Sequence, residues 1–142
     1  MTSPDAPKLR GVKETALYVD DLNRAVAFYR DALGLSALVA DARLCAFDVN
    51  GSHILLLFLR GASRTDSALP GGVIPPHDGN GPLHIGFAVD ADELEAWEQR
   101  LTRHGVPIES RVSWPLGGRS IYFRDPDGHL LELLTPGVWK TY

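Results

Sequence analysis

The chain has 142 residues, of which 44% are hydrophobic and 23% charged, and its formal net charge is −4. This length suits one domain, or two very small modules that share a core. The acidic balance and the lack of a basic run give no reason to expect nucleic acid as a partner. The longest wholly apolar run, Ile54–Leu59, is too short to span a bilayer.

The start of the chain and its cysteine content indicate a cellular setting. The opening residues, MTSPDAPKLRG, contain no apolar segment of the kind that a secretory signal needs. Cys45 is the only cysteine, so an intrachain disulfide is excluded, which fits a reducing compartment. Its apolar surroundings favour a core position over a nucleophile. We therefore expect a cytoplasmic protein that does not bind membranes.

One pattern occurs twice along the chain. Residues 14–35, ETALYVDDLNRAVAFYRDALGL, and residues 84–106, HIGFAVDADELEAWEQRLTRHGV, each begin with an alternating strand-like run and continue into a helical pattern. Asp20 or Asp21 is placed to cap the first helix, and Asp92 to cap the second. Gly34 and Gly105 supply the left-handed conformation that ends many helices.

Short strand candidates follow each helix. They are expected at about 37–40, 44–49 and 52–58 in the first half, and at about 107–112, 119–124 and 129–134 in the second. Asn50-Gly51 favours a tight hairpin because both turn positions need a positive φ. The DPDG sequence of Asp125–Gly128 favours a type I turn. The pattern therefore predicts an α+β fold of two βαβββ modules, 10–60 and 83–136.

The modules are separated by residues 61–82, GASRTDSALPGGVIPPHDGNGP. This segment is rich in Gly and Pro, and we expect no regular element in it. It is long for a loop inside a compact domain, which favours a linker or a lid.

Three potential metal ligands fall on the predicted strand faces. His84 shares a face with Gly86 and Ala88, whose small side chains leave space beside the imidazole. Glu14 matches His84 when the two modules are placed in register, and Glu132 sits among four leucines in HLLELLTP. Carboxylates and a neutral imidazole suit divalent Mn, Fe, Ni, Co or Zn. Three protein ligands would leave coordination positions open for water or substrate.

The same residues also have a purely structural interpretation. Glu14 can pair with an arginine, and His84 can be a strand histidine with satisfied hydrogen bonds. Glu132 can pair with Arg119 or Arg124. Spacing alone is compatible with both interpretations.

Three segments closely resemble the vicinal oxygen chelate superfamily: ETALYVDDLNRAVAFYRDALGL, GPLHIGFAV and GGRSIYFRDPDGHLLELLTP. That superfamily includes glyoxalase I, extradiol dioxygenases, fosfomycin-resistance thiol transferases, methylmalonyl-CoA epimerase and bleomycin-binding proteins. The resemblance covers about residues 10 to 137. It implies paired βαβββ modules that curl into a half-barrel around a central cavity, a metal at inward strand positions, and a homodimer whose cavity is often built from both chains. Carried over residue by residue, the family's ligands fall on Glu14, His84 and Glu132.

The sequence departs from the family pattern at two ligand positions. The fourth ligand position falls on Leu56, which cannot bind a metal, and His53 lies nearby in the wrong register. The chain therefore resembles the three-ligand branches rather than glyoxalase I. Glu14 stands where extradiol dioxygenases usually have a histidine. Two carboxylates would make the ion a weaker Lewis acid, which weakens the dioxygenase and fosfomycin transferase interpretations.

Five further residues are candidates for substrate binding. Arg119 either clamps a carboxylate or phosphate or closes a surface hairpin. Tyr122 lies on the opposite face of the same strand, so we expect only one of the two in the cavity. Trp114 and Tyr18 would supply aromatic walls. His77, in the linker, either donates a proton from a lid or is a solvated loop residue.

These observations support competing functions. The first is a divalent-metal-dependent enzyme of glyoxalase or dioxygenase type, with lyase, isomerase or transferase chemistry on a small oxygen-chelating substrate. In it Glu132 would orient and charge-balance the ion, and Glu14 would act as a base. The second is a metal-free protein like the bleomycin-resistance members, which sequesters a small molecule in a dimer groove. An inactive structural descendant, with Glu14 and Glu132 in salt bridges, is the third.

Overall fold

The structure is a computed structural model that describes residues 5–142. Its first half forms a four-stranded sheet in the order β1-β4-β3-β2, in which β1 and β4 are parallel and the other pairs antiparallel. The elements are β1 (Glu14–Val19), α1 (Leu22–Asp31), β2 (Ser36–Ala40), β3 (Leu44–Val49) and β4 (His53–Leu59).

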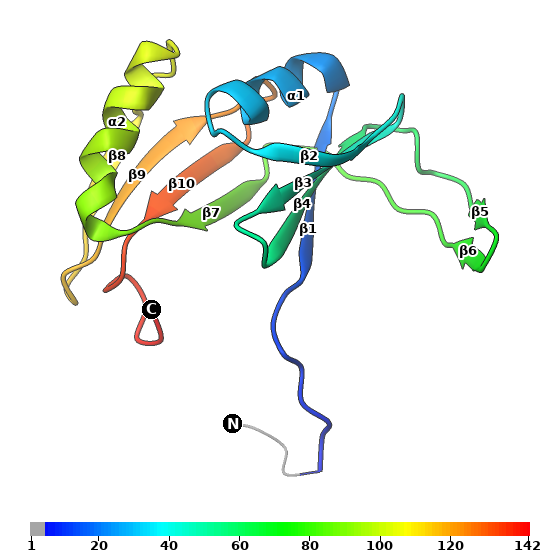
Figure 1. Ribbon diagram of the computed structural model, residues 1–142, viewed down its shortest axis with the longest axis horizontal. Coiled ribbons are helices and arrows are strands. Elements are labelled where there is room, and N and C mark those ends of the chain that lie inside the picture. Colours follow the sequence, from blue (N-terminus) through cyan, green and yellow to red (C-terminus); the bar gives the residue numbers. More distant parts are fainter. Residues whose placement is uncertain (1–4) are drawn as a thin grey trace.

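The second half repeats this arrangement in the order β7-β10-β9-β8, with β7 and β10 parallel. Its elements are β7 (His84–Ala88), a 3-10 turn (Ala91–Glu93), α2 (Leu94–Arg103), β8 (Ser110–Ser113), β9 (Arg119–Arg124) and β10 (Leu130–Leu134). Figure 1 shows the two sheets side by side, with α1 above the first and α2 beside the second. The predicted pair of βαβββ modules is therefore confirmed. Within residues 5–142 the two curved sheets do not close into a barrel.

The helix ends follow the sequence signals in part. The Asp21 carboxylate accepts a hydrogen bond from the Arg24 backbone N–H at 3.0 Å and so caps α1. The predicted cap at Asp92 is wrong, because Asp92 lies inside the 3-10 turn that precedes α2. Gly34 and Gly105 have φ of +70° and +71°, as the predicted helix stops require.

The linker contains more structure than its composition predicts. Strands β5 (Ser67–Leu69) and β6 (Gly72–Ile74) form a small antiparallel hairpin, so the expectation of no regular element is wrong. Figure 1 shows this hairpin projecting from the body of the molecule. Gly72, the first residue of β6 after the turn, has φ of +153°, a conformation that L side chains rarely adopt.

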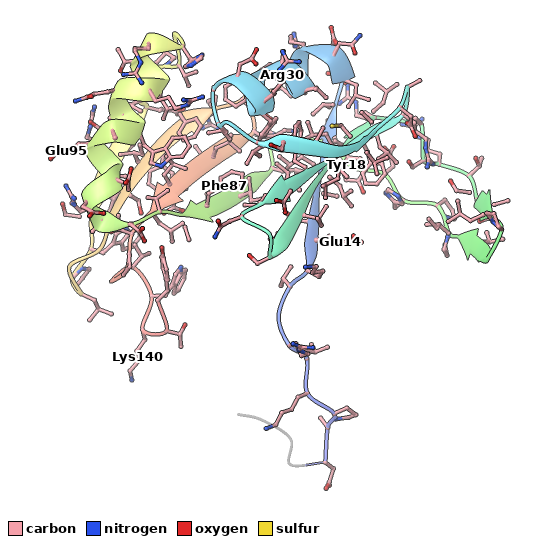
Figure 2. The ribbon with its side chains drawn as sticks, viewed as in Figure 1. Glu14, Tyr18, Arg30, Phe87, Glu95 and Lys140 are labelled. Carbon is pink, nitrogen blue, oxygen red and sulfur yellow. The ribbon has the colours of Figure 1, made fainter. Side chains whose placement is uncertain are left out.

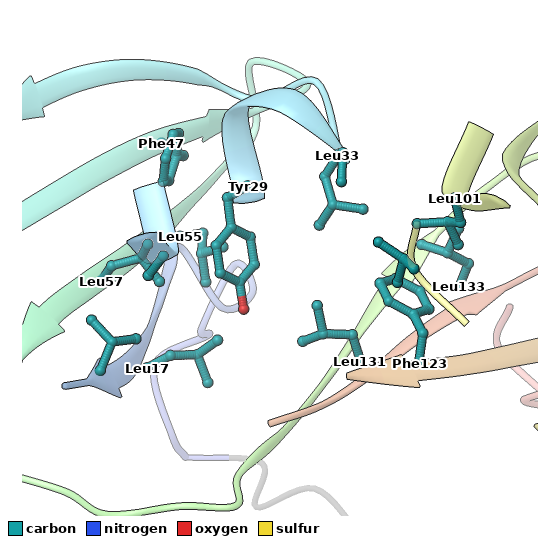
Figure 3. Packing of buried hydrophobic residues seen from close by; sticks show 14 of the residues in the cluster. Leu17, Tyr29, Leu33, Phe47, Leu55, Leu57, Leu101, Phe123, Leu131 and Leu133 are labelled. Atoms are coloured by element: carbon teal, nitrogen blue, oxygen red, sulfur yellow. The ribbon is translucent and has the colours of Figure 1, made fainter. Parts of the chain in front are cut away.

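The core joins the two modules. Tyr29 of α1 packs near Phe47 and Leu55 of the first sheet, and Leu101 of α2 lies with Phe123 and Leu133 of the second (Figure 3). All the side chains that Figure 3 labels belong to one buried cluster. Cys45 is also fully buried there, as its apolar neighbours predict.

Polar contacts from the DPDG turn reinforce this junction. The Tyr29 hydroxyl donates to Asp125 Oδ2 at 2.7 Å. The buried His129 ring accepts from the Leu83 N–H through Nδ1, at 2.8 Å, and its Nε2 lies 2.7 Å from the Tyr18 carbonyl oxygen. Since a carbonyl only accepts, Nε2 carries the proton and His129 bridges the modules.

No helix within residues 5–142 is long and apolar enough to cross a membrane.

Candidate metal centre

Glu132 lies on β10, the strand between β7 and β9. Its side chain is only 9% exposed. The Ser120 hydroxyl donates to Glu132 Oε2 at 2.6 Å, and the Tyr122 hydroxyl donates to the same oxygen at 3.1 Å. The carboxylate is thus held by two neutral donors, and its other oxygen is left for a different partner.

That second oxygen faces His84. The distance from Glu132 Oε1 to His84 Nε2 is 3.4 Å. His84 Nδ1 lies 2.8 Å from the Leu130 carbonyl oxygen, and only a protonated Nδ1 can bond to that acceptor. In a neutral His84, Nε2 therefore presents a lone pair to a carboxylate oxygen.

Two acceptors this close repel each other unless a cation lies between them or the ring takes a second proton. A divalent ion meets this requirement, and its His ligands usually donate the other ring N–H to a backbone carbonyl or a carboxylate, as His84 does to Leu130. The donor set of this pair fits a metal.

Space beside the pair is provided by a glycine. Gly86 on β7 stands directly across from Glu132 in the parallel ladder. A Cβ at position 86 would lie 2.9 Å from Leu134 Cδ2 and 3.6 Å from Glu132 Oε1. A Cβ there would press on Leu134 and come into van der Waals contact with Oε1, so the glycine leaves Oε1 without a side-chain contact from position 86.

Two predicted aromatic residues support the site in different ways. The Tyr122 ring stacks near His84, with centroids 6.3 Å apart, and burial together with the Glu132 charge raises the pKa of its phenol. Tyr122 therefore remains a hydrogen-bond donor. Trp114 does not face the pair directly: its indole N–H donates to Ser120 Oγ at 2.8 Å, which orients the hydroxyl that holds Glu132.

The arginines that offered a structural explanation for Glu132 are engaged elsewhere. Arg119 donates to the Ala91 carbonyl oxygen at 3.1 Å, on the surface. Arg124 pairs with Glu109 at 2.7 Å and lowers the pKa of that carboxyl. Of Arg119 and Tyr122, only Tyr122 lies beside the pair of His84 and Glu132.

Glu14 lies apart from this pair. It begins β1, the edge strand of the other sheet, and Figure 2 shows it at the lower end of that strand. At the distances observed, Glu14 forms no ion pair with any residue of the described range 5–142. The described part of one chain contains no cluster of three His, Cys, Asp or Glu residues with metal-binding geometry. One chain thus brings His84 and Glu132 together, without Glu14.

Glu14 instead lines a hollow on the first sheet, which we call the first hollow. This cavity of about 490 Å³ is bounded by strands of the first sheet and by the linker. Tyr18 and His77 also line it, and the Tyr18 hydroxyl lies 2.8 Å from His77 Nδ1. Burial and the charge of Asp78 raise the pKa of Tyr18.

The ladder registers explain the missing fourth ligand. Leu56 stands opposite Ala16 in the parallel pair of the first sheet, as Glu132 stands opposite Gly86 in the second. The position equivalent to Glu132 is therefore occupied by leucine. Sequence reasoning overlooked Ser120, although its place two residues before Tyr122 puts it on the same strand face.

Comparison with known proteins identifies the class that this fold defines. A family model described as the Glyoxalase/Bleomycin resistance protein/Dioxygenase superfamily matches residues 11–133. The chain belongs to this superfamily, as its motifs indicate.

Individual relatives include enzymes with different names. The chain is 35% identical to a lactoylglutathione lyase from Agrobacterium tumefaciens, whose crystal structure superposes with a TM-score of 0.85 over 94% of this chain and 99% of that chain. It is 30% identical over 133 residues to the metallothiol transferase FosB of Bacillus licheniformis, covering 93% of this chain and 79% of the relative. The FosB of Shouchella clausii is 28% identical over 129 residues, covering 89% and 81%. These relatives support a metal-dependent enzyme of the superfamily.

Proposed function

We propose that this protein is a divalent-metal-dependent enzyme that acts on a small substrate able to chelate the ion through adjacent oxygens. His84 and Glu132 would supply two of the ligands. The observation that carries the proposal is their 3.4 Å approach as two acceptors, with both nearby arginines bonded elsewhere. An imidazole with carboxylates suits Mn, Fe, Ni, Co or Zn.

The third ligand in this proposal is Glu14 from a second copy of the chain. Glu14 is exposed in the first hollow, and the pair lies on the other sheet. In a homodimer that places the first hollow of one copy over β7 and β10 of the other, each copy completes the other's site. The ion would then be held by one imidazole and two carboxylates.

When bound, the ion would polarise the substrate oxygens and stabilise negative charge that develops on them. Glu132 would hold its position through the two hydroxyls on Oε2, and it would balance the charge. Tyr122 would remain protonated beside the site and keep donating its hydrogen bond to Glu132 Oε2. Glu14 would serve as a ligand and, when released, as a base.

Relatives narrow the reaction classes worth testing. A metallothiol transferase and a lactoylglutathione lyase both act, by name, on compounds with a thiol or a thiol-derived group. Thiol transfer and lyase chemistry on a thiol adduct are therefore the first reactions to assay. Either would use the same ion site, since one scaffold supports many reactions.

Metal-free sequestration of a small molecule is the second candidate. The first hollow favours it, because its volume of about 490 Å³ and its walls of Tyr18 and Phe58 suit an aromatic ligand. Glu14 at its rim would suit a cationic one.

A thermal-shift screen distinguishes the two functions. The protein is freed of metal and then tested with each of the five divalent ions, and separately with bleomycin and related cationic aromatics. Stabilisation by an ion, lost in Glu132→Ala, supports the enzyme, because a ligand that binds only the folded state raises the melting temperature. Stabilisation by a drug and by none of the ions supports sequestration.

Mixing two damaged variants tests the shared site. Glu14→Ala and Glu132→Ala are purified separately, and their subunits are exchanged. A mixed dimer has one site with all three ligands and one with two missing, so mixing restores ion binding that neither variant shows alone. If mixing restores nothing, the two glutamates do not act across copies.

A further inference from the structure

Arg43 lines the first hollow and takes no part in the proposed metal site. Its Nη1 donates to Ser67 Oγ at 2.7 Å, across the hollow's border with the linker. Within residues 5–142 its guanidinium pairs with no carboxylate, whereas Arg60 pairs with Asp20 and Arg64 with Asp78. A half-buried guanidinium without a carboxylate can bind an anion through its remaining N–H groups.

A second observation in the same hollow also indicates a ligand. Ser63 is only 3% exposed, and its Oγ has no hydrogen-bond partner among the described residues. Buried hydroxyls nearly always have a partner, because burial without one removes the hydrogen bonds to water and puts nothing in their place. Since Ser63 lines the hollow, an acceptor bound there would satisfy it.

The strand ladder places Arg43 at the opposite end of the hollow from Glu14. The Leu59 N–H donates to the Arg43 carbonyl oxygen, and Leu59 stands opposite Val19 at the far end of β1. Glu14 and Val19 are five residue steps apart on β1, so about 16 Å along the strand separates Glu14 from the level of Arg43. The hollow is basic at one end and acidic at the other.

Between these ends the walls are apolar and aromatic. Ala16 and Leu56 line the floor, and Tyr18 stacks near Phe58 with ring centroids 5.9 Å apart. His77 packs edge-on to Phe58 at 4.5 Å and holds the Tyr18 hydroxyl. This surface favours an apolar or aromatic group over a strongly hydrated one.

From these contacts we propose that the first hollow binds an organic oxyanion, a carboxylate or phosphonate on an apolar stem. The anion bonds to Arg43 and Ser63, and the stem packs against Tyr18 and Phe58. The inference deepens the proposed function and rests on it in one respect: in the enzyme, the bound anion is the end of the substrate remote from the ion.

Calorimetric titration of the metal-free protein tests this assignment. Benzoate and phenylphosphonate serve as probes for the two oxyanions, and benzamide serves as the uncharged control. Both anions are expected to bind and benzamide to bind at least tenfold more weakly. Arg43→Met, which keeps the stem and removes the charge, lowers anion affinity about ten- to hundredfold, because a charged hydrogen bond is lost. Ser63→Ala lowers it about threefold to tenfold, and Arg43→Lys restores part of it.

Arg111→Met is the matched control, since Arg111 pairs with Glu98 on α2 and does not line the hollow. It leaves anion binding unchanged. Equal affinity of the wild-type protein and Arg43→Met, or benzamide binding as tight as benzoate, overturns the assignment. Metal loading of Arg43→Met is measured in parallel. If the wild-type protein loads metal but binds neither anion, only the anion subsite is rejected. If it binds the anions but loads no metal, only the metal site is rejected.

Discussion

A carboxylate buried among leucines is costly unless hydrogen bonds and a cation compensate for it. Glu132 has the hydrogen bonds, because Ser120 and Tyr122 both donate to Oε2. In our proposal the cation is a divalent metal ion bound between Oε1 and His84 Nε2. At the scale of single residues, the account therefore depends on how firmly Glu132 is held in place.

Ser120→Ala tests that support. The variant removes the 2.6 Å bond to Glu132 and also leaves the Trp114 N–H without its acceptor. Loss of such a supporting contact is expected to weaken metal binding about 10- to 100-fold. Tyr142→Phe is the control, because the Tyr142 hydroxyl bonds to the backbone carbonyls of Val89 and Leu134 and to neither His84 nor Glu132. Unchanged affinity in Ser120→Ala, measured by competition with a chelating dye, would mean that Glu132 needs no such support.

The residue scale also shows how far the sequence could predict the site. Alternation along a strand places His84 beside Gly86, and it puts Glu132 on a face with other residues of β10. The same rule would have found Ser120. The meeting of Arg43 with Ser63 and Ser67 was beyond it, because both serines lie on the linker and no periodicity encodes where the linker runs.

At the scale of elements, strands with strong alternation and helices with glycine stops were predictable, and the irregular segments were not. The cap of α2 failed at Asp92 because the chain makes a 3-10 turn first, which shifts the helix start to Leu94. The β5–β6 hairpin was missed because its strands are three residues each, too short for a period of two to be visible.

Asp78 anchors the linker that carries this hairpin. Its carboxylate accepts from Arg64 at 2.8 Å and from the Gly61 N–H at 3.0 Å, and the Arg64 bond in particular lowers its pKa from 3.8 to about 2. A lowered pKa means that the anchor is fully present above 3.8 and is lost as the pH falls through about 2.

We therefore expect the linker to loosen over that acidic range. The heteronuclear NOE of the Gly61 amide should fall in the wild-type protein between these two pH values, while Asp78→Asn shows the low value throughout. Asp66→Asn, on the same linker, should behave like the wild-type protein. A flat wild-type profile that equals the profile of Asp78→Asn would show that Asp78 does not order the linker.

At the scale of the whole molecule, two similar modules share one core and a set of polar bridges. The bridges come from the DPDG turn, through Asp125 to Tyr29, and from the residue after it, through His129 to Tyr18. They fix how the two sheets sit, and hence where the first hollow lies relative to His84 and Glu132.

Tyr29→Phe tests the strength of this junction. The substitution keeps the buried ring and leaves Asp125 Oδ2 without its donor, which should lower the free energy of unfolding by about 1–3 kcal/mol. Urea denaturation measures the change. Tyr142→Phe, which loses only partly exposed bonds to backbone carbonyls, should change it far less. Equal stability of Tyr29→Phe and the wild-type protein would show that the turn does not hold the modules together.

Metal content per chain tests the central claim most directly. The protein is stripped with a chelator, loaded in turn with Mn, Fe, Ni, Co and Zn, desalted, and analysed by mass spectrometry of the elements. We predict about one ion per chain for at least one metal in the wild-type protein, and almost none in Glu132→Ala or His84→Ala of intact fold. Wild-type protein that retains none of the five ions, or variants that retain as much as the wild type, would contradict the account.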